Sequence, residues 1–484
     1  MAKQKESIQE RLRKGRLNRK QRRELNRHLA AADPGLTIVN PNAGGIDVGN
    51  ESHFAAVPSN RDAQPVQEFG CCTQELIRMA KWLVSCGIDT VAVQATGVYW
   101  IGLYDILTSH NLRVVLVNAR HTQNVPGRKT DVLECQWLMK LHTYGLLRDS
   151  FHLAKELEGI RTMWRLRGRH VAEAGRAVQH MQKALTTMNI QLANALSDIT
   201  GVSGMRIVTA ILNGERDPYR LADLRDKRVR ASREEVARSL EGTWRDDLLF
   251  ELAQALNQYR FIHEQMEQCD RQLAVYLSQI PSAPVAAPAS VEPAPSKPKK
   301  PKTSGKARGN QPVILNLEAE LTRICGVNLC SIDGISVITA QTIVAEIGTN
   351  MSAFPTEGHF TSWLGLTPNL DISGGKVVRR GKRKTQNRVA QALRMSATAL
   401  LNSDSYLGAK YRHLRRQLPA NKSAVKAMAR ILAVLVYRMF TRGKAWVDRG
   451  AVFHEQRRTE LDLARLQSTA RARGFKLIPI SQAS

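Results

Sequence analysis

Between about residues 37 and 150, short strand-like apolar runs alternate with longer segments that have a helical repeat. The strand-like runs are GGIDVG leading into HFAAVP, then TVAVQAT, then RVVLVNA. The helical segments between them are TQELIRMAKWLVSCG and YWIGLYDILTSH. This alternation predicts an α/β layered domain with a partly parallel sheet over residues 37–150.

A helical repeat replaces this alternation over residues 151–280. Apolar residues recur there at spacings of three and four in two stretches, which are Val178, Met181, Leu185, Met188, Leu192 and Ala195, and then Leu249, Leu252, Leu256, Tyr259, Ile262 and Met266. The spacing predicts two long helices in an antiparallel or intersubunit coiled coil, in which the Met and Leu side chains form core. Between them, residues 201–244 contain Gly, Asp-Pro and charged turns, which predict a small helical insertion.

Proline is concentrated in the next segment, because eight of the eighteen prolines lie between Pro281 and Pro312. Residues 281–312 are therefore predicted to be a disordered, extended linker. A mostly helical domain is predicted over residues 313–452, with a C-terminal tail at 453–484. This domain opens with two short helical patterns around Gly334, in outline similar to a helix-hairpin-helix that presents N–H groups to a phosphate, although ordinary helix packing remains an alternative.

The net charge of the chain indicates what kind of partner it binds. The 484 residues contain 71 Lys and Arg against 43 Asp and Glu, which gives a net charge of +28 at pH 7. Such an excess favours a polyanionic partner. Eleven of these basic residues lie between Lys3 and Arg27, so residues 1–36 are predicted to form a solvated basic arm.

Several other classes of protein do not fit the sequence. There is no apolar run of membrane-spanning length, and the first twenty residues lack the apolar core of a signal peptide. The seven cysteines include no CxxC pair, which argues against a disulfide framework and a zinc site. We therefore expect a protein of the reducing cytoplasm.

Three acidic residues are candidates for chemistry. Asp47 lies in the strand start GIDVG, where flanking glycines would present its carboxylate at the centre or end of a strand. Asp131 and Glu134 are three residues apart at the start of a helical pattern and therefore project from one face. Acidic residues in a first helical turn also commonly complement the helix dipole, which is the alternative role for this pair.

Ser373 is a second candidate, in the segment LDISGGK. The two glycines after it would let the backbone approach a phosphate closely and leave the hydroxyl free to attack, whereas a simple turn is the alternative. A basic run follows, whose charges would stabilise a phosphoryl transition state and bind nucleic acid. The residues assigned to nucleic-acid binding are Arg128, Lys129, Lys376, Arg379, Arg380, Lys382, Arg383, Lys384 and Arg388.

Four segments carry a family resemblance: GIDVG, QATGVYW, VNARHTQNVPGRKTD and GLTPNLDISGGK. In this order they resemble the DEDD transposases of the insertion-sequence one-hundred-ten family, particularly its eleven-eleven subgroup, over roughly residues 40–450. The resemblance implies an RNase H-like (RuvC-like) domain, a coiled coil and a C-terminal transposase domain with a serine nucleophile. It also implies a bacterial recombinase guided by a structured noncoding RNA, the bridge RNA, which pairs with donor and target DNA.

The family's acidic quartet falls on Asp47, Gln94, Asp131 and Glu134 in this sequence. The second and fourth positions depart from that quartet as an amide and a longer carboxylate. Because Mg²⁺ prefers hard oxygen ligands, the resemblance implies a Mg²⁺ site on Asp47, Asp131 and Glu134, with Gln94 as the weakest ligand. It also implies that Ser373 becomes covalently joined to DNA.

The combined prediction is an RNA-guided transposase that acts through a phosphoserine intermediate. Recombination joins two duplexes, so a homotetramer assembled through the coiled coil is expected. Two other classes remain open at this stage. One is a metal-dependent junction-resolving endonuclease that uses the RNase H-like domain alone, and the other is a non-catalytic nucleic-acid-binding protein.

Overall fold

We describe a computed structural model of the chain at residues 35–95, 97–118, 130–283, 310–373, 376–381, 387–418, 420–443 and 450–477. For residues 369–373, 376, 379 and 380, only the backbone is described. The predicted basic arm and most of the predicted linker lie outside these ranges. The chain divides into two compact units, Met1–His152 and Leu153–Ser484.

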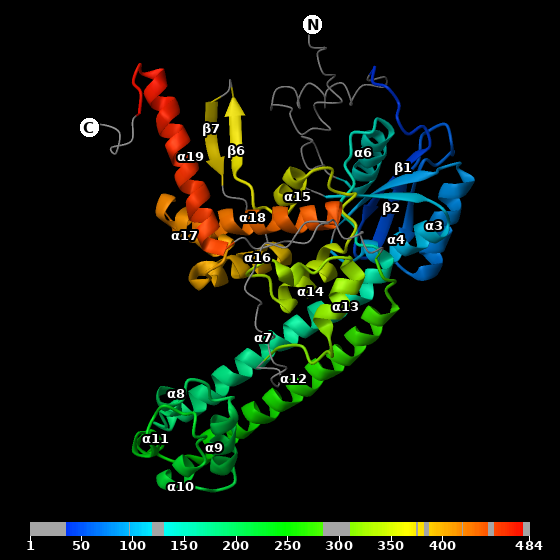
Figure 1. The fold of residues 1–484 in the computed structure, drawn as a ribbon. Helices are drawn as coiled ribbons and strands as arrows, with labels where there is room; N and C mark the ends of the chain where they lie inside the picture. The colour runs from blue at the N-terminus through cyan, green and yellow to red at the C-terminus, as the bar shows by residue number, and fades with distance from the viewer. Residues whose placement is uncertain are drawn as a thin grey trace. The chain divides into compact units, whose positions relative to one another are not determined.

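A five-stranded sheet forms the centre of the first unit, with strand order β3-β2-β1-β4-β5 (Figure 1). The strands are β1 (Ala43–Val48), β2 (Ser52–Ala56), β3 (Val66–Gly70), β4 (Thr90–Gln94) and β5 (Arg113–Val117). The first three pair antiparallel, whereas β4 is parallel to both β1 and β5. The predicted α/β domain with a partly parallel sheet is therefore confirmed.

Helices cover both faces of this sheet. On one face, α3 (Thr73–Ser85) and α4 (Trp100–Ser109) bury Met79, Leu83 and Leu103 against alternate residues of the strands. On the other face, α6 (Asp131–Thr143) places Leu138 against Ala92, Val115 and Val117. Because successive strand residues point to opposite faces, this division fixes the direction in which each strand residue points.

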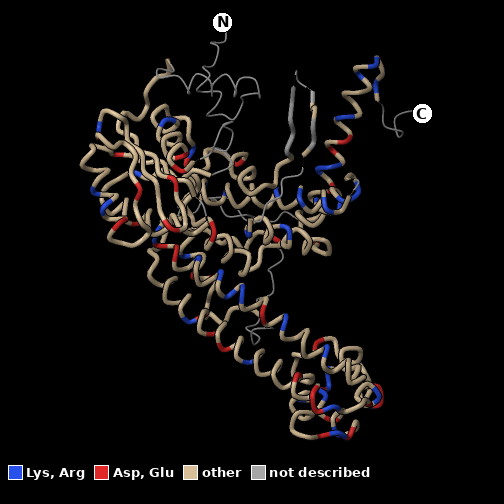
Figure 2. The backbone as a smooth tube through the Cα atoms, turned by 180° about the vertical axis from the view of Figure 1, so that it is seen from behind, with Lys and Arg blue, Asp and Glu red and all other residues tan. Residues whose placement is uncertain are grey.

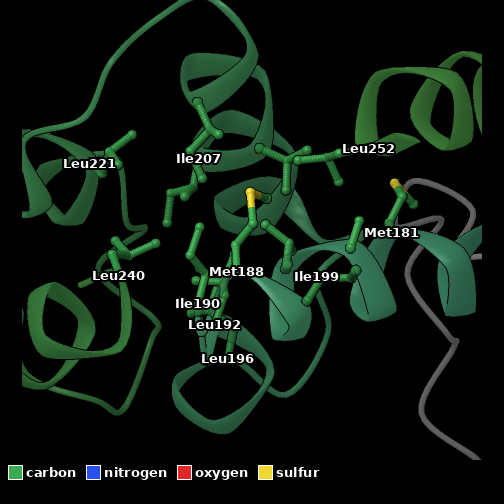
Figure 3. Packing of buried hydrophobic residues seen from close by; sticks show 14 of the residues in the cluster. Met181, Met188, Ile190, Leu192, Leu196, Ile199, Ile207, Leu221, Leu240 and Leu252 are labelled. Atoms are coloured by element: carbon green, nitrogen blue, oxygen red, sulfur yellow. The ribbon is translucent and has the colours of Figure 1, made fainter. Parts of the chain in front are cut away.

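Two long helices, α7 (Glu158–Thr187) and α12 (Asp246–Gln279), run side by side in the second unit after a short turn, η1 (Lys155–Leu157). Met181 and Leu185 share a core with Leu252, while Arg167 contacts Asp270 further along, so the two helices are antiparallel. Four short helices join them: α8 (Leu192–Ala195), α9 (Val202–Leu212), α10 (Pro218–Asp223) and α11 (Arg233–Ser239). Their apolar residues pack around Met188 at the end of the hairpin (Figure 3).

A buried ion pair crosses the hairpin. Arg167 donates from Nε to Asp270 Oδ1 at 2.6 Å and from Nη2 to Oδ2 at 3.3 Å. The same two side chains bind the last part of the predicted linker and the chain just after it, because Arg167 Nη1 donates to the Asn310 carbonyl at 3.0 Å and Val313 N–H donates to Asp270 Oδ2 at 2.9 Å. Arg323 of α13, after the linker, donates to the Leu277 and Ile280 carbonyls, where α12 ends and the linker begins. The chain that follows the linker is therefore bound to the hairpin at two places.

The rest of the second unit is mostly helical, as predicted. Its elements are α13 (Leu317–Cys325), η2 (Leu329–Ser331), α14 (Val337–Ile347), α15 (Glu357–Trp363), β6 (Asn369–Ser373), β7 (Lys376–Gly381), α16 (Arg388–Ala399), η3 (Leu400–Asn402), α17 (Tyr406–Gln417), α18 (Asn421–Arg442) and α19 (Gly450–Ala472). None of the described helices is both long enough and apolar enough to cross a bilayer.

Two segments differ from the sequence-based expectation. Before Gly334, the predicted first helix of a helix-hairpin-helix is only the short turn η2, which Asn328 caps by accepting from Cys330 N–H. Gly334 itself has a positive φ of 86°, which favours glycine and separates η2 from α14. The predicted tail is helical as far as Ala472, and Phe453 and His454 of α19 contact the ring of Tyr406 on α17.

The buried pair predicts a large effect of Asp270→Ala. Asp270 is 2% exposed and Arg167 5% exposed, so the substitution leaves a buried guanidinium without its carboxylate. We expect unfolding free energy to fall by about 3–5 kcal/mol, measured by chemical denaturation. In the exposed pair of Asp223 with Arg233, the matched change Asp223→Ala should lower the unfolding free energy far less, because solvent screens this pair. Equal losses for the two variants would contradict a structural role for the buried pair.

Candidate functional site

Asp47 and Gln94 occupy adjacent positions on two neighbouring parallel strands. The register pairs Gly45 with Ala92 and Ile46 with Val93, so the next positions along β1 and β4 are Asp47 and Gln94. Asp47 is only 8% exposed, and Gln94 is half-buried. Polar residues at the carboxyl ends of parallel strands are a common arrangement for ligand binding in α/β sheets.

Both positions face helix α6. A Cβ atom added to Gly45 would overlap the carbonyl oxygen of Cys135 and the amide nitrogen of Met139, so the backbone of α6 lies directly on β1 there. Asp47, two residues along the strand, lies on the same face as Gly45. Ala92 packs against Leu138 of α6, so Gln94 is on that face as well.

The first turn of α6 lies at the same edge of the sheet. At the opposite end of the helix, the His142 Nε2 atom lies 2.8 Å from the hydroxyl of Thr90, the first residue of β4, so α6 runs antiparallel to β4. Burial lowers the pKa of His142 to about 4, which keeps this ring neutral near pH 7. Asp131 and Glu134 are thus carried to the end of the strands where Asp47 lies.

The electrostatic environment of Cys135 agrees with this placement. The pKa of its thiol is raised to about 12, chiefly by burial and in smaller part by the negative charges of Asp47 and Asp131. One thiol therefore senses carboxylates from both β1 and the first turn of α6. Thr130 caps that turn by accepting from Leu133 N–H, with Asp131 exposed and Glu134 half-buried.

The donor set suits a hard divalent cation. It consists of carboxylates at Asp47, Asp131 and Glu134 and the amide oxygen of Gln94, all oxygen donors of the kind that Mg²⁺ prefers. Within the described residues, however, no group of three or more His, Cys, Asp or Glu side chains is already arranged to hold a metal. The structure therefore gathers the predicted ligands at one edge of the sheet without a closed ligand cluster.

Ser373 lies on a different unit, at the end of strand β6. It pairs in register with Lys376, the first residue of β7, and only Gly374 and Gly375 separate the two strands along the chain. In the described part of the chain, β6 and β7 form a two-stranded sheet of their own (Figure 1). The candidate nucleophile thus lies at the turn end of a two-stranded ribbon, across from the start of the basic run.

The other residues predicted to bind nucleic acid fall into three groups. One group lies outside the described residues: Arg128, Lys129, Lys382, Arg383 and Lys384. A second group, of which only the backbone is described, belongs to β7: Lys376, Arg379 and Arg380. Arg388 is the first residue of α16, and its side chain is 50% exposed. Its Nε atom lies 3.7 Å from Glu346 Oε1, so part of its charge is directed toward the protein.

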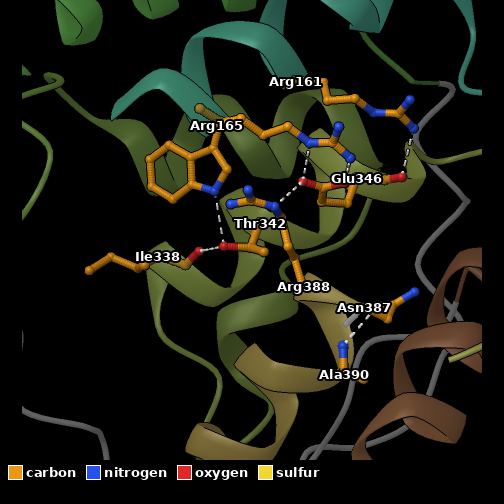
Figure 4. Close-up of polar contacts among 9 residues, drawn as sticks. Arg161, Arg165, Ile338, Thr342, Glu346, Asn387, Arg388 and Ala390 are labelled. Atoms are coloured by element: carbon orange, nitrogen blue, oxygen red, sulfur yellow. Dashed lines mark hydrogen bonds and ion pairs between the residues drawn. The ribbon is translucent and has the colours of Figure 1, made fainter. Parts of the chain in front are cut away.

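Glu346, which sequence patterns did not single out, accepts hydrogen bonds from arginine side chains (Figure 4). It lies near the end of α14 and is 7% exposed. Arg165 of α7 donates to both of its carboxylate oxygens, at 2.9 and 2.6 Å. Arg161 Nη2 donates to its backbone carbonyl at 3.0 Å, and Trp164 Nε1 donates to Thr342 Oγ1 at 3.1 Å. These contacts join α7, α14 and α16; no charge run or motif marked Glu346 in the sequence.

Two protein-family models match the chain. One, described as "Transposase" and built on DEDD transposases of the IS110 type, matches residues 44–190. The other, described as "Transposase IS116/IS110/IS902 family", matches residues 327–412. The chain carries both domains of an IS110-family transposase. No curated protein matches it.

The two matches coincide with the two candidate centres of the transposase. The first contains the sheet with Asp47 and Gln94 and the whole of helices α6 and α7, and the second contains α14, α16 and the ribbon with Ser373. Family membership supports an enzyme that cuts and rejoins DNA. DEDD transposase domains typically depend on a divalent metal, which agrees with the oxygen donors at the edge of the sheet.

The contact at Gly45 predicts how α6 responds to a single methyl group. Gly45→Ala forces the backbone of α6 away from β1, and we expect a loss of about 3 kcal/mol in unfolding free energy, measured by denaturant titration. Gly102→Ala is the matched control, because an added Cβ at this exposed position in α4 meets nothing within 4 Å. Helix propensity should make the control slightly more stable. A neutral Gly45→Ala would show that α6 does not rest on β1.

Proposed function

We propose that the transposase joins donor and target DNA through a phosphoserine intermediate on Ser373, guided by a structured noncoding RNA encoded by its element. The observation that carries this proposal is the position of Ser373 at the turn end of the β6–β7 ribbon, inside the second family match. Lys376 lies across from it in register, and the basic run continues along β7. A hydroxyl beside cations is suited to attack on a phosphodiester.

The proposed chemistry needs no nucleotide cofactor. Ser373 Oγ forms a bond to phosphorus as the bond from phosphorus to one DNA oxygen breaks. The serine loses its proton, and the departing oxygen takes up a proton to become a free hydroxyl end. A hydroxyl end from another strand then attacks the phosphoserine and releases Ser373, so that one phosphodiester replaces another. The basic residues after Ser373 stabilise the extra negative charge on phosphorus in both steps.

A divalent metal, proposed to be Mg²⁺, belongs to the first unit in this scheme. Asp47, Asp131 and Glu134 would hold it, with Gln94 offering a neutral amide oxygen. Such an ion supplies positive charge for phosphate oxygens. With three carboxylates in the set rather than four, we propose weaker retention of a second metal.

The guide RNA is proposed from the overall charge together with the family resemblance. A chain with a net charge of +28 suits extensive contact with phosphate backbones. Reading of sequence by base pairing would leave the protein with backbone and shape contacts, as in RNA-guided nucleases. The DNA duplexes and the RNA are therefore the proposed partners, in the bacterial cytoplasm.

A covalent-adduct assay tests the serine mechanism. The full chain is incubated with its element's flanking RNA, labelled donor and target duplexes and Mg²⁺, and denaturing gels are examined for a protein–DNA adduct. We expect an adduct with wild type, none with Ser373→Ala, and a strong reduction with Asp47→Asn or with chelator. Ser352→Ala, at an exposed turn of the same unit, is the matched control and should form the adduct normally.

Each alternative class gives a different result in this assay. An adduct that persists in Ser373→Ala would place the nucleophile elsewhere. Cleavage that requires Asp47 but forms no adduct would favour the metal-dependent junction-resolving endonuclease. Binding without cleavage or adduct would favour a nucleic-acid-binding protein. An adduct that forms equally well without the RNA would remove the guide from the proposal.

We propose that the solvent-facing side of α12 is one of the surfaces that assemble the transposase into a tetramer. One row along this helix carries no charge over its whole length: Phe250, Gln254, Gln258, Phe261, Gln265, Gln268, Gln272, Val275 and Gln279. Phe250 is 66% exposed and Phe261 59% exposed. A second copy of the same helix would cover these rings, and recombination between two duplexes calls for more than one copy.

Charged residues in this row should therefore reduce the oligomer. We expect Phe250→Asp/Phe261→Asp to lower the molecular mass of the assembly measured by light scattering at a fixed concentration. Phe475→Asp is the control, because Phe475 is 71% exposed but lies after α19 rather than on the row. An unchanged mass for the double variant would remove α12 as the assembly surface.

A further inference from the structure

The two long helices of the hairpin carry opposite charge. Helix α7 contains six Lys and Arg and two Glu, whereas α12 contains two Arg and six Asp and Glu. Figure 2 shows Lys and Arg along one helix of this pair, and most of the Asp and Glu along the other. Of these two helices, α7 therefore presents the surface that would attract a polyanion.

The basic residues of α7 form one row on its solvent side. Arg165, Arg169, Arg176 and Lys183 are separated by four, seven and seven residues, which places them on one face of the helix. This basic row lies opposite the buried face that carries Ala174, Ala177 and Met181. All four of its side chains are exposed.

The carboxylates near the basic row neutralise it only partly. Glu173 and Glu251 approach Arg176 and Lys183 at 4.0 Å, the outer limit of an ion pair. Arg169 forms no ion pair among the described residues. Exposed pairs of this kind contribute little free energy, so these cations are available to another anion at low cost.

A second row on the same side of α7 has almost no side chains. Gly168, Ala172 and Gly175 are all exposed, and a Cβ added at Gly175 would meet nothing within 4 Å. Glycine is the poorest helix former after proline, so two exposed glycines weaken a helix that has to span the hairpin. Their benefit is a shallow surface beside the arginines, which a ligand backbone could approach closely.

Further cations gather at the end of the basic row nearest α14 and α16. The Arg388 guanidinium would lie 3.8 Å from a Cβ at Gly168, so it reaches over the shallow row. Arg161 Nε is buried and has no hydrogen-bond acceptor in the described chain. Burial, with the nearby charge of Arg165, lowers the pKa of the Arg161 guanidinium. Glu346 accepts hydrogen bonds from Arg161 and Arg165 and forms an ion pair with Arg388, so three cations surround this one carboxylate (Figure 4).

We propose that the basic row of α7, with Arg388 at one end and the glycine row beside it, binds the sugar–phosphate backbone of a nucleic-acid helix. From Arg165 to Lys183 the row extends about 27 Å at 1.5 Å per residue. This length matches about eight base pairs of duplex DNA at 3.4 Å per pair. The surface would carry the duplex away from the Ser373 ribbon along the hairpin. This inference rests on the proposed function, since it assigns a surface to its DNA or RNA.

Charge reversal on the helix tests the surface in the full chain. We expect Arg169→Glu/Arg176→Glu to raise the Kd for a duplex of about 20 base pairs roughly tenfold at physiological salt, and to reduce the slope of log K against log salt by about 2. Arg260→Glu/Arg271→Glu makes the same charge change on α12 and should leave both values close to those of the wild type. Melting curves verify that all variants fold.

Parallel titrations with a DNA duplex and an RNA duplex of random sequence identify the source of the phosphates. If the α7 variant loses affinity for only one of the two duplexes, the surface binds that nucleic acid. If it loses affinity for both, the surface can bind either backbone. Equal losses in the α7 and α12 variants, or none in either, would overturn the proposal. This binding assay requires no catalysis, so its result stands even if Ser373 forms no adduct with DNA. If the adduct forms normally but the α7 variant binds the duplex as well as wild type does, the α7 surface is ruled out and the proposed function is not affected.

An uncharged variant separates shape from charge. Gly175→Leu adds a side chain to the shallow row while it removes an unfavourable helix glycine, so the melting temperature should rise. We nevertheless expect weaker duplex binding, by several fold, because the new side chain blocks close approach. Gly102→Leu, at an exposed position of helix α4, is the matched control and should bind as wild type. Binding by Gly175→Leu that equals this control would contradict the role of the glycine row.

Discussion

The contact between the backbone of α6 and strand β1 at Gly45 is the constraint on which the first unit depends. No side chain larger than hydrogen fits there, so the helix rests directly on the sheet. The contact of His142 with Thr90 fixes the far end of α6 at the start of β4. The helix is therefore held along its length, and its acidic first turn reaches the strand ends that carry Asp47 and Gln94. Packing thus determines where the charges of this site lie.

In the second unit, two carboxylates with buried arginine contacts organise the chain. Asp270 joins α7 to α12 and also accepts from the backbone after the predicted linker. Glu346 joins α7 to α14 and α16. Because Asn310, Val313 and Arg323 all bind the hairpin, the helices that follow the linker are attached to it by these contacts as well as by the chain itself. The Arg167–Asp270 pair would be costly to break, since removal of one partner leaves a buried charge, whereas the Arg165 side chain that binds Glu346 is 46% exposed.

Much of the fold follows from local sequence pattern. Strand-like runs and helical repeats predict β1, β4, β5, α3, α4 and the two long helices, because the spacing of apolar residues in each segment matches the side that is buried. The start of α6 also has a recognisable sequence signal, with Thr130 as its N-cap and acidic residues in its first turn. The η2 turn and helix α19 were not predicted correctly. Around Gly334 a glycine with positive φ interrupts the helical pattern, and α19 has no buried apolar face to reveal it.

The sequence by itself determined the strands of the first unit, the two long helices, the positive charge and the identities of the candidate residues Asp47, Asp131, Glu134 and Ser373. Tertiary structure decided which of them share a face, that Arg388 faces Glu346, and that the basic row of α7 remains exposed while α12 carries the acids. The physical reason is that periodicity reports how each segment is buried, whereas the partner of a side chain depends on close packing between segments far apart in the chain. Gly45 in the sequence reads as a flexible strand residue, and only the helix lying against it shows why no larger residue fits.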